Sequence, residues 1–336
     1  MKTHVELGAD SYDILIERGA IKKFKELTGI NSKVLVVTDS GVPQEYSECI
    51  ASQFDDALVY TIPQGEESKN LTQFGEILSF MLRNNFTRSD CVVACGGGVP
   101  GDLAGFVSAC YMRGLKFYNV PTTVLSQVDS SIGGKTAVDL DGIKNTVGAF
   151  HQPKMVVIDP DVLNTLPDRQ ISNGLAEAVK MSLTSDKDLF EMFENVDILE
   201  NIEEILFKSV EIKRKVVEQD EKEQGLRMIL NFGHTIGHGI ESEEELNHLY
   251  HGECVALGMI PMCSEKVRAR LVPVLKKLNL PVDINPDIDK VISAIVHDKK
   301  ARKDYINTVF VDEVGSYEMR KTKADDIKNL ISVIVK

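Results

Sequence analysis

Cys91-Val-Val-Ala-Cys-Gly-Gly-Gly-Val-Pro-Gly-Asp102 is the stretch of sequence that decides the fold. Its first five residues form a short apolar run, which is typical of a parallel strand buried on both faces. The run ends directly in glycines, and Gly96, Gly98 and Gly101 match the pattern GxGxxG ahead of a helical pattern over 103–112. Glycines there permit positive φ and close backbone approach, and a helix N-terminus offers N–H donors to phosphate. The pattern indicates a pyrophosphate-binding loop, with a tight strand-to-helix turn as the simpler alternative.

Short β-branched runs recur on both sides of this stretch. They predict further strands at 33–38, 57–62, 117–120 and 155–158, with a helical pattern between two of them at 71–82. Strands joined by crossover helices predict a doubly wound, mainly parallel, Rossmann-like sheet. Residues 5–7 and 12–16 are suited to a hairpin ahead of that sheet.

The second half of the chain has a different pattern, because strand signals largely vanish after about residue 160. Amphipathic helical patterns follow at 171–183, 198–217, 234–246, 253–267 and 288–296, with a small strand at 308–311 and a closing helix at 327–335. A chain of 336 residues also exceeds what one hydrophobic core usually serves. We therefore predict an α/β N-terminal domain over 1–160 and an all-α C-terminal domain over 161–336.

Composition limits the partners of this chain. The formal net charge is −13, and no basic stripe with interleaved aromatic residues relieves it, so we expect no nucleic-acid partner and no membrane partner. Nothing after Met1 resembles a signal peptide, and no apolar run approaches the length of a bilayer. The six cysteines contain no CxxC pair, which fits buried thiols in a reducing compartment. We predict a cytoplasmic location.

Histidine-bearing segments suggest a metal site. Glu177 together with His234 and His251 offers one carboxylate oxygen and two imidazole nitrogens, a set that suits a zinc-like ion with an open position. His234 and His238 are four residues apart on one helix face, and His248 competes with His251. The residues alone leave open which two histidines bind the metal, and each is equally well explained as a capped or core histidine.

Several loops carry groups suited to anions. Asp129-Ser-Ser-Ile-Gly-Gly-Lys135 places a lysine beside two glycines, where an anion meets no steric obstruction, and Lys144-Asn145 follows. Pro63-Gln-Gly-Glu-Glu-Ser-Lys69 offers Glu66 to ribose hydroxyls and Lys69 to phosphate, although an ordinary polar loop explains it as well. Pro121-Thr-Thr123 opens a helix with two hydroxyls, for which capping is the simplest explanation. The clustering of Lys135, Lys144 and Asn145 at a predicted sheet edge favours anion binding by that group.

At this point the chain resembles the 3-dehydroquinate synthase family of sugar phosphate cyclases. The resemblance extends from Val34 to about Tyr317, nearly the whole chain. Its most specific pieces are 96–106, 111–114, 121–123, 127–136, 226–227 and 230–238. The resemblance implies that Glu177, His234 and His251 hold one divalent ion, Zn²⁺ or Co²⁺, and that His238 is left for the substrate.

The resemblance also implies an NAD site and a substrate site. The predicted NAD site comprises Glu66, Lys69, Gly97, Gly98, Val99, Asp102, Thr122 and Thr123, to which we add Asp39, Lys135, Lys144 and Thr165. The predicted substrate site comprises Asp129, Lys135, Asn145, Lys180, Lys213, Arg227, Asn231 and His238. Lys300 joins the substrate site, with the adjacent Lys299 as its alternative. Arg113 would reach the substrate phosphate of the neighbouring subunit, which predicts a homodimer.

The implied reaction converts 3-deoxy-D-arabino-heptulosonate 7-phosphate, a small anionic phosphosugar, to 3-dehydroquinate and phosphate. It proceeds by transient oxidation with NAD, β-elimination of phosphate, reduction, ring opening and aldol closure, as a carbon–oxygen lyase of the shikimate pathway. Two alternatives remain open. One is a metal- and NAD-dependent polyol dehydrogenase, such as a glycerol dehydrogenase, and the other is a sugar phosphate cyclase that makes a different carbocycle.

Overall fold

The computed structural model covers residues 1–336, and the structure describes all of them except 244–247, 286 and 299–304. The chain divides into two compact units, which are described separately below. The first unit comprises Met1–Pro167 and Lys213–Lys222, and the second comprises Asp168–Ile212 and Glu223–Lys336. The predicted division into functional domains near residue 160 stays a prediction.

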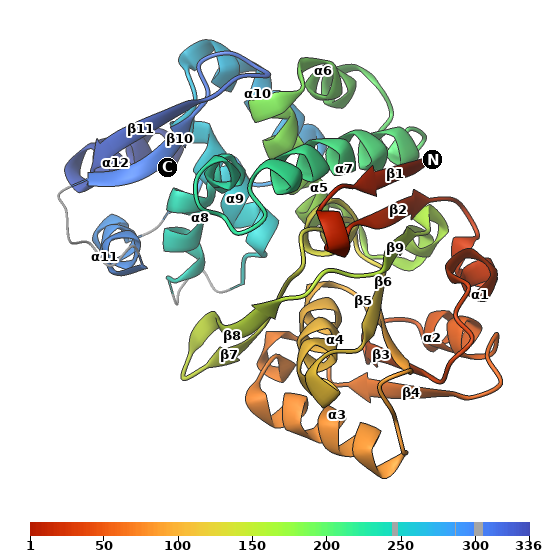
Figure 1. The fold of residues 1–336 in the computed structure, drawn as a ribbon. Helices are drawn as coiled ribbons and strands as arrows, with labels where there is room; N and C mark the ends of the chain where they lie inside the picture. The colour runs from red at the N-terminus through yellow and green to blue at the C-terminus, as the bar shows by residue number, and fades with distance from the viewer. Residues whose placement is uncertain (244–247, 286, 299–304) are drawn as a thin grey trace. The chain divides into compact units, whose positions relative to one another are not determined.

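The first unit is built on a seven-stranded sheet (Figure 1). Its strands are β1 (Lys2–Val5), β2 (Tyr12–Ile16), β3 (Val34–Asp39), β4 (Ala57–Ile62), β5 (Cys91–Gly96), β6 (Lys116–Pro121) and β9 (Met155–Ile158). They lie in the order β1-β2-β9-β6-β5-β3-β4, and β1 alone pairs antiparallel with its neighbour. The predicted mainly parallel sheet is confirmed, and so is the hairpin ahead of it, although its first strand lies earlier than 5–7.

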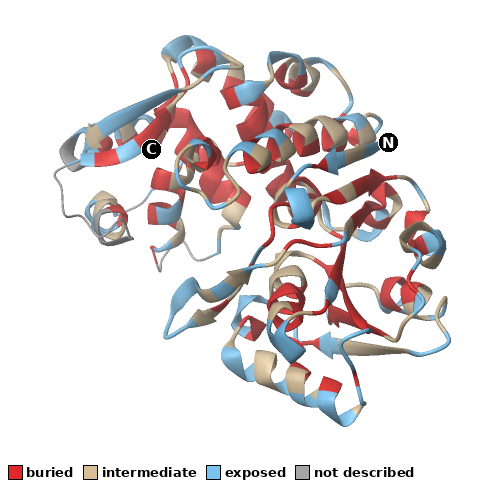
Figure 2. Ribbon diagram, in the orientation of Figure 1, coloured by how far each residue is buried: buried red, intermediate tan, exposed pale blue. Residues whose placement is uncertain are grey.

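Helices cover both faces of this sheet, and the apolar residues of its central strand β3 point alternately to the two faces. Leu35 and Val37 of β3 pack with helices α3 (Leu71–Arg83) and α4 (Gly98–Cys110). Val34 and Val36 pack on the opposite face with α1 (Phe24–Thr28) and α2 (Gln44–Ala51). The two faces are visible in Figure 1, and the buried strands are red in Figure 2. A strand with no solvent-facing side is expected to read as an unbroken apolar run.

Strand order creates a place for ligands in the first unit. The chain passes from β3 outward to the edge strand β4 and then returns to β5 on the other side of β3. Open parallel sheets bind ligands outside the carboxyl ends of the strands at such a reversal. Asp39 ends β3 and Gly96 ends β5, so the predicted pyrophosphate loop begins at the reversal point.

A second hairpin in the first unit was not expected from the sequence. It consists of β7 (Lys135–Leu140) and β8 (Ile143–Phe150), which pair antiparallel apart from the seven-stranded sheet. Most of β8 is exposed, and the apolar residues Ile143 and Phe150 face solvent. A strand with so little buried surface carries no clear alternation of apolar and polar residues, which is why the pattern missed it.

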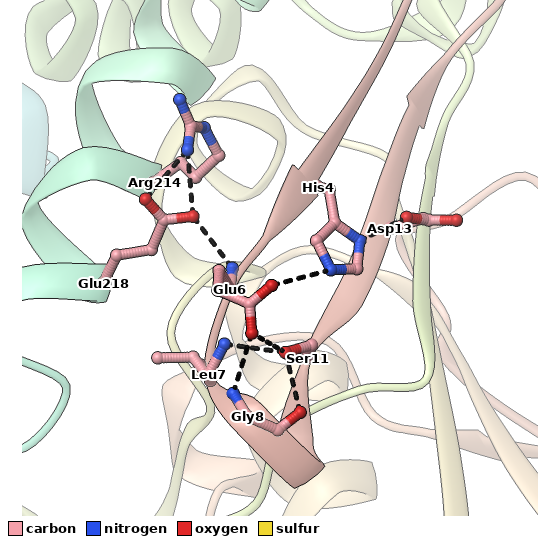
Figure 3. A network of polar contacts seen from close by, with 8 residues as sticks. All are labelled: His4, Glu6, Leu7, Gly8, Ser11, Asp13, Arg214 and Glu218. Carbon is pink, nitrogen blue, oxygen red and sulfur yellow. Dashed lines mark hydrogen bonds and ion pairs between the residues drawn. The ribbon is translucent and has the colours of Figure 1, made fainter.

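The last turns of α7 (Ile202–Gln219) belong to the first unit, where they are tied to the β1–β2 hairpin. Figure 3 shows this network. Arg214 donates to both carboxylate oxygens of Glu218, at 2.9 and 2.8 Å, and Glu218 Oε1 accepts the backbone N–H of Glu6 at 2.8 Å. Further along, Gln152 Nε2 donates to Glu221 Oε1 at 2.9 Å. These contacts hold residues 213–222 against the first unit.

The second unit is mainly helical. Its other helices are α5 (Asp168–Ser185), α6 (Lys187–Asn195), α8 (His234–Glu241), α9 (His251–Met259), α10 (Glu265–Lys277), α11 (Ile288–Asp298) and α12 (Ala324–Ile331). The predicted helical second half is confirmed, but "all-α" is too narrow. β10 (Tyr305–Phe310) and β11 (Glu318–Lys323) form an antiparallel hairpin, of which only the strand at 308–311 was expected.

Several predicted helices of the second half have bounds that differ from the observed ones: the helix expected over 327–335 is Ala324–Ile331, the one expected over 198–217 is Ile202–Gln219, and two others differ more. The single helix expected over 253–267 is two helices, because α9 ends at Met259 and Pro261 lies in a short 3-10 turn. Cys263 then bridges to Val311, and Ser264 starts α10 by accepting the N–H of Val267 at 3.4 Å. The helix expected over 234–246 ends at Glu241, and 244–247 lie outside the described residues. Among the described residues, no helix is long and apolar enough to cross a membrane.

Candidate active site

Three side chains of the second unit converge as a candidate metal centre. Glu177 comes from α5, while His234 and His251 are the first residues of α8 and α9. Each histidine Nε2 lies 3.5 Å from Glu177 Oε1, and one ligand atom from each of the three residues lies within 4.8 Å of the others. The set of one carboxylate and two imidazoles matches the donors expected for a Zn²⁺-type ion with an open position.

Tight helix packing brings these residues together. Gly233 precedes His234 with φ +77°, a conformation that other residues rarely adopt. A Cβ on Gly233 would lie 2.8 Å from the carbonyl oxygen of Val255 in α9, so glycine lets the start of α8 approach that helix. On the other side, the N–H of Gly252 donates to Asn173 Oδ1 of α5 at 2.6 Å. Each contact fixes a helix end that carries a candidate ligand.

Glu177 fits the role of a metal ligand. Its side chain is 1% exposed, and neither carboxylate oxygen accepts a hydrogen bond from the residues that the structure describes, although Lys180 forms an ion pair with Oε2. Burial alone would raise the pKa of Glu177, but Lys180, His234 and His251 hold it well below its usual range. Lys180 pairs with Oε2, whereas the buried Oε1 has no hydrogen-bond partner among the described residues and faces the two histidines, which suits a bound cation.

The two histidines differ in charge. Burial, with the positive charge of Lys180, lowers the pKa of His234 to about 3, so this imidazole is neutral, as a metal ligand must be. Burial would also lower the pKa of His251, but the neighbouring carboxylates of Glu177 and Glu241 raise it to about 10. Binding of a cation at His251 would therefore release a proton.

The two other histidines that the sequence offered as ligands, His238 and His248, lie outside the trio. The ring of His238 lies 5.2 Å from that of His234 and 6.0 Å from that of His251, so it borders the trio. His238 also forms a second possible ligand set with Glu241 and His251. His248 belongs to neither set, and its carbonyl oxygen accepts from Arg169 at 2.7 Å.

Besides His238, three predicted substrate residues of the second unit lie in described segments, and one of them, Lys180, contacts the trio. Lys180 is 2% exposed beside Glu177, and Arg227 is also 2% exposed, in the 3-10 turn that precedes α8. Asn231 lines a pocket of about 360 Å³. The pocket also includes Thr235 and Asn307, which the sequence patterns did not single out. Lys300, and its alternative Lys299, lie outside the described residues.

Predicted cofactor residues of the first unit gather at the carboxyl ends of the strands. Gly97 precedes the first turn of α4, and a Cβ there would lie 3.3 Å from Thr123 Cγ2 after β6. Thr122 donates its N–H to the carbonyl oxygen of Gly96 at 2.9 Å, which joins the loops after β5 and β6. Gly97 and Gly98 have no side chain to cover the N-terminal N–H donors of α4, which is the arrangement that a pyrophosphate requires. Val99, the next predicted cofactor residue, follows them in the same turn.

A second group in the first unit surrounds Lys69. Its ammonium lies 2.6 Å from Asp102 Oδ2 and 3.6 Å from Glu66 Oε1, and it also donates to Asn145. Burial alone would lower the pKa of Lys69, but these two acids raise it. Burial raises the pKa of Asp102 to about 6 despite the neighbouring lysine. The structure thus places Asn145, predicted to contact substrate, among the predicted cofactor residues.

The remaining predicted residues of the first unit are more dispersed. Asp129 lies in a short π-helical turn, Ser126–Ser130, and forms an ion pair with Lys213 of α7. Lys135 is exposed at the start of β7, and Lys144 is exposed in β8. Burial raises the pKa of Asp39, whose Oδ1 accepts the N–H of Gly41 at 2.7 Å. Thr165 Oγ1 shares a hydrogen bond of 2.8 Å with the hydroxyl of Tyr46.

Arg113 has an unusual backbone. It follows α4 at φ +71°, directly after Met112 at φ +47°. Two successive residues in the left-handed region are strained, and such strain persists where the surrounding structure imposes it, often at functional sites. The side chain of Arg113 is exposed.

The sequence patterns also missed Glu241, whose Oε2 lies 3.2 Å from His251 Nδ1. It follows His234 by seven residues and His238 by three, so the three share one helix face. Extending the histidine spacing by one more turn would have identified it.

Two solved structures share this architecture over nearly the whole chain. A 2-deoxy-scyllo-inosose synthase, complexed with carbaglucose-6-phosphate, NAD⁺ and Co²⁺, is 25% identical with a TM-score of 0.89, covering 98% of this chain and 99% of that one. ValA, the 2-epi-5-epi-valiolone synthase of Streptomyces hygroscopicus subsp. jinggangensis, with NAD⁺ and Zn²⁺ bound, is 24% identical with a TM-score of 0.86, covering 98% and 97%. The fold is therefore that of the sugar phosphate cyclases.

Sequence comparison narrows this class. Residues 59–173 match the model of the 3-dehydroquinate synthase N-terminal part, and residues 174–301 match that of the C-terminal part. The 3-dehydroquinate synthase of Streptococcus thermophilus is 41% identical over 353 aligned positions, covering 98% of this chain and 99% of that protein. The chain belongs to the 3-dehydroquinate synthase family.

Proposed function

We propose that this chain converts 3-deoxy-D-arabino-heptulosonate 7-phosphate to 3-dehydroquinate and phosphate, as a carbon–oxygen lyase of the shikimate pathway. The family to which it belongs supports this activity. The single observation that carries it is the buried and ionised carboxylate of Glu177, whose Oε1 faces the Nε2 atoms of His234 and His251 at 3.5 Å while Lys180 pairs with Oε2. That arrangement fits one divalent ion, Zn²⁺ or Co²⁺.

The residues of the chain divide the work between two cofactors. Glu177, His234 and His251 would hold the metal ion, and the loops after β4, β5 and β6 would hold NAD, with Lys69 and the start of α4 facing phosphate. When bound, the metal ion polarises substrate hydroxyl groups, and NAD accepts and later returns a hydride. Asp102 and Glu66 keep the ammonium of Lys69 charged, since they raise its pKa.

Cationic side chains are suited to bind a substrate that carries both a phosphate and a carboxylate. Lys180 and Arg227 are almost fully buried in the second unit, where each charge is screened little by water. Both can bind carboxylate or phosphate oxygens, Arg227 with a planar fork and Lys180 as a point charge. His238 and Asn231 add hydrogen-bonding groups. We propose that these residues, with Asp129, Lys135, Lys213 and Lys300, orient the substrate and move its protons.

We also propose that the protein acts as a homodimer in the cytoplasm. Arg113 is exposed, has a strained backbone and contacts no charged partner among the described residues, as suits a side chain that serves a neighbouring subunit. All six cysteines are free thiols, which suits a reducing compartment. Sedimentation at several protein concentrations tests the dimer, and mixing Arg113→Ala with Lys135→Ala subunits tests the shared site. Restored activity in the mixture is the expected result.

The deciding experiment is an assay of phosphate release from the heptulosonate phosphate with trace NAD, with and without a chelator. We expect many turnovers per NAD, no net NADH, and loss of activity on chelation. Net NADH formation from glycerol, with no phosphate release, would instead identify a polyol dehydrogenase.

A second candidate function is favoured by the 2-deoxy-scyllo-inosose synthase likeness, since that protein shares the fold almost completely. In this second function the chain would be a sugar phosphate cyclase whose substrate is a sugar phosphate other than the heptulosonate phosphate. A panel of sugar phosphates, including ones without a carboxylate, separates the two candidates. Turnover of a substrate without a carboxylate at a similar rate would support the second candidate.

A further inference from the structure

Both histidines of the metal trio direct Nε2 toward Glu177, and each has a fixed partner on its other ring nitrogen. His234 Nδ1 lies 3.1 Å from the carbonyl oxygen of Phe232. A carbonyl oxygen only accepts, so Nδ1 carries the hydrogen and Nε2 keeps a free lone pair when the ring is neutral. The backbone therefore sets the tautomer of His234.

His251 has a side chain in the corresponding place. Its Nδ1 lies 3.2 Å from Glu241 Oε2, and its Nε2 lies 3.5 Å from Glu177 Oε1. We propose that Glu241 is a positioning residue, which accepts the Nδ1 hydrogen of His251 and so presents Nε2 to a divalent ion. Partners of this kind fix the orientation of a histidine ligand and raise its basicity.

The fold suits Glu241 to this role. Glu241 is the last residue of α8, and His251 is the first residue of α9, a neighbouring helix in the same unit. The Glu241 side chain is 22% exposed, so its carboxylate is partly screened but not desolvated like that of Glu177. A charged acceptor at Nδ1 stabilises the His251 ring and leaves Nε2, which faces Glu177, for the ion.

A competing role for Glu241 is that of a ligand itself. Glu241, His238 and His251 also place ligand atoms within 4.8 Å of one another. In that set the Glu241 carboxylate would bind the ion directly and would not position His251. The unsatisfied oxygens of Glu177 favour the first set, because they are buried, whereas Glu241 is partly solvated.

The test measures binding of Zn²⁺ and Co²⁺ alone to the full chain, without NAD or substrate, by competition with a chelator. Glu241→Ala should weaken affinity about 10–100-fold, as loss of such a partner typically does. Glu241→Gln keeps a neutral acceptor and should recover part of that loss. Ser242→Ala is the matched control, because Ser242 Oγ donates to the carbonyl oxygen of His238 at the same helix end without contacting His251. It should bind like the native chain.

Other outcomes separate the possibilities. Native affinity in folded Glu241→Ala, judged by circular dichroism, would overturn the proposal. Binding of a second ion by the native chain, absent from Glu241→Ala, would overturn it in favour of a ligand role, and the absorption spectrum of bound Co²⁺ would change with the ligand set. The inference rests on the proposed function, yet its failure is distinct. A native chain that binds neither ion defeats both, whereas native binding without an effect of Glu241 defeats this inference alone.

Discussion

The metal trio of the second unit and the cofactor residues of the first unit are assembled in opposite ways. The trio comes from three packed helices, and Glu177 is buried without a hydrogen bond. The cofactor residues lie at strand ends, where Lys69 already has acidic and amide partners. In the trio, Lys180 therefore pairs with one carboxylate oxygen of Glu177 and leaves the other, Oε1, facing the two histidines, whereas in the Lys69 cluster the ammonium itself lies among its acidic and amide partners. This difference predicts which substitutions affect stability, metal binding or cofactor binding.

The largest expected effect is at Glu177. Glu177→Gln removes the ligand charge and leaves Lys180 buried beside a neutral group, so we expect metal binding and turnover to be lost. We also expect a loss of stability of about 3–5 kcal/mol. Chelator competition and urea unfolding measure these effects. The double variant Glu177→Gln/Lys180→Met should regain stability but not metal binding. Recovery of metal binding in it would contradict the assignment of Glu177 as a ligand.

Lys135 and Arg227 should separate turnover from stability. Either alanine variant should lower kcat about 10²–10³-fold, because each loses an anion-binding group. Lys135 is exposed, so Lys135→Ala should unfold like the native chain, whereas Arg227 is 2% exposed and its loss should also destabilise the fold. Steady-state kinetics with denaturant unfolding on both variants tests this contrast. Equal stability of the two variants would show that burial of Arg227 does not stabilise the second unit.

Gly233 tests the packing of the helices that carry the two histidines. Gly233→Ala adds a strained φ and a Cβ 2.8 Å from a backbone oxygen, so we expect more than the 1–3 kcal/mol of strain alone. Gly29→Ala in the first unit is the control, because Gly29 has φ +63° but no atom within 4 Å of the added Cβ. Urea unfolding compares the two. If both variants lose the same stability, close packing at Gly233 contributes little.

The smallest expected effect is a dependence of the free energy of unfolding on pH, which arises from Asp102. Its pKa is raised from 3.8 to about 6, so the native state holds this proton more tightly than the unfolded state. The stabilising contribution is complete below pH 3.8 and is lost as the pH rises through about 6. Between pH 5 and 7 the native chain should lose about 1 kcal/mol relative to Asp102→Asn. Urea unfolding at both pH values provides the measurement, and parallel changes in both proteins would rule the effect out.

Much of the fold was predictable because burial leaves a pattern. The strands around Leu35 and Val92 are apolar on both faces, and the glycines after Cys95 mark the end of β5. The β7–β8 hairpin was not predictable, since β8 buries little surface and only Thr136 and Val138 of β7 are buried. The break between α9 and α10 at Pro261 was not predicted, because helical periodicity alone does not show where a helix ends.

The site was partly predictable from residue types. Sequence alone left the choice of histidines open, and family resemblance nominated His234 and His251, the pair that lies at Glu177 in the structure. The contact between Asp129 and Lys213 joins residues far apart in the chain, so no local spacing foretells it. Glu241 was overlooked because a lone glutamate at a helix end is usually a solvated surface group.

Residues 213–222 have a consequence for how the protein is made. The chain leaves the first unit after Pro167, builds several helices of the second, and returns with these ten residues before continuing. Synthesis proceeds from the amino end, and domains generally fold as they emerge. Here the first unit has to wait for residue 222 to leave the ribosome before Asp129 meets Lys213 and Glu6 meets Glu218. A gene split after Pro167 would thus leave the first unit without residues 213–222, which the second product would have to supply.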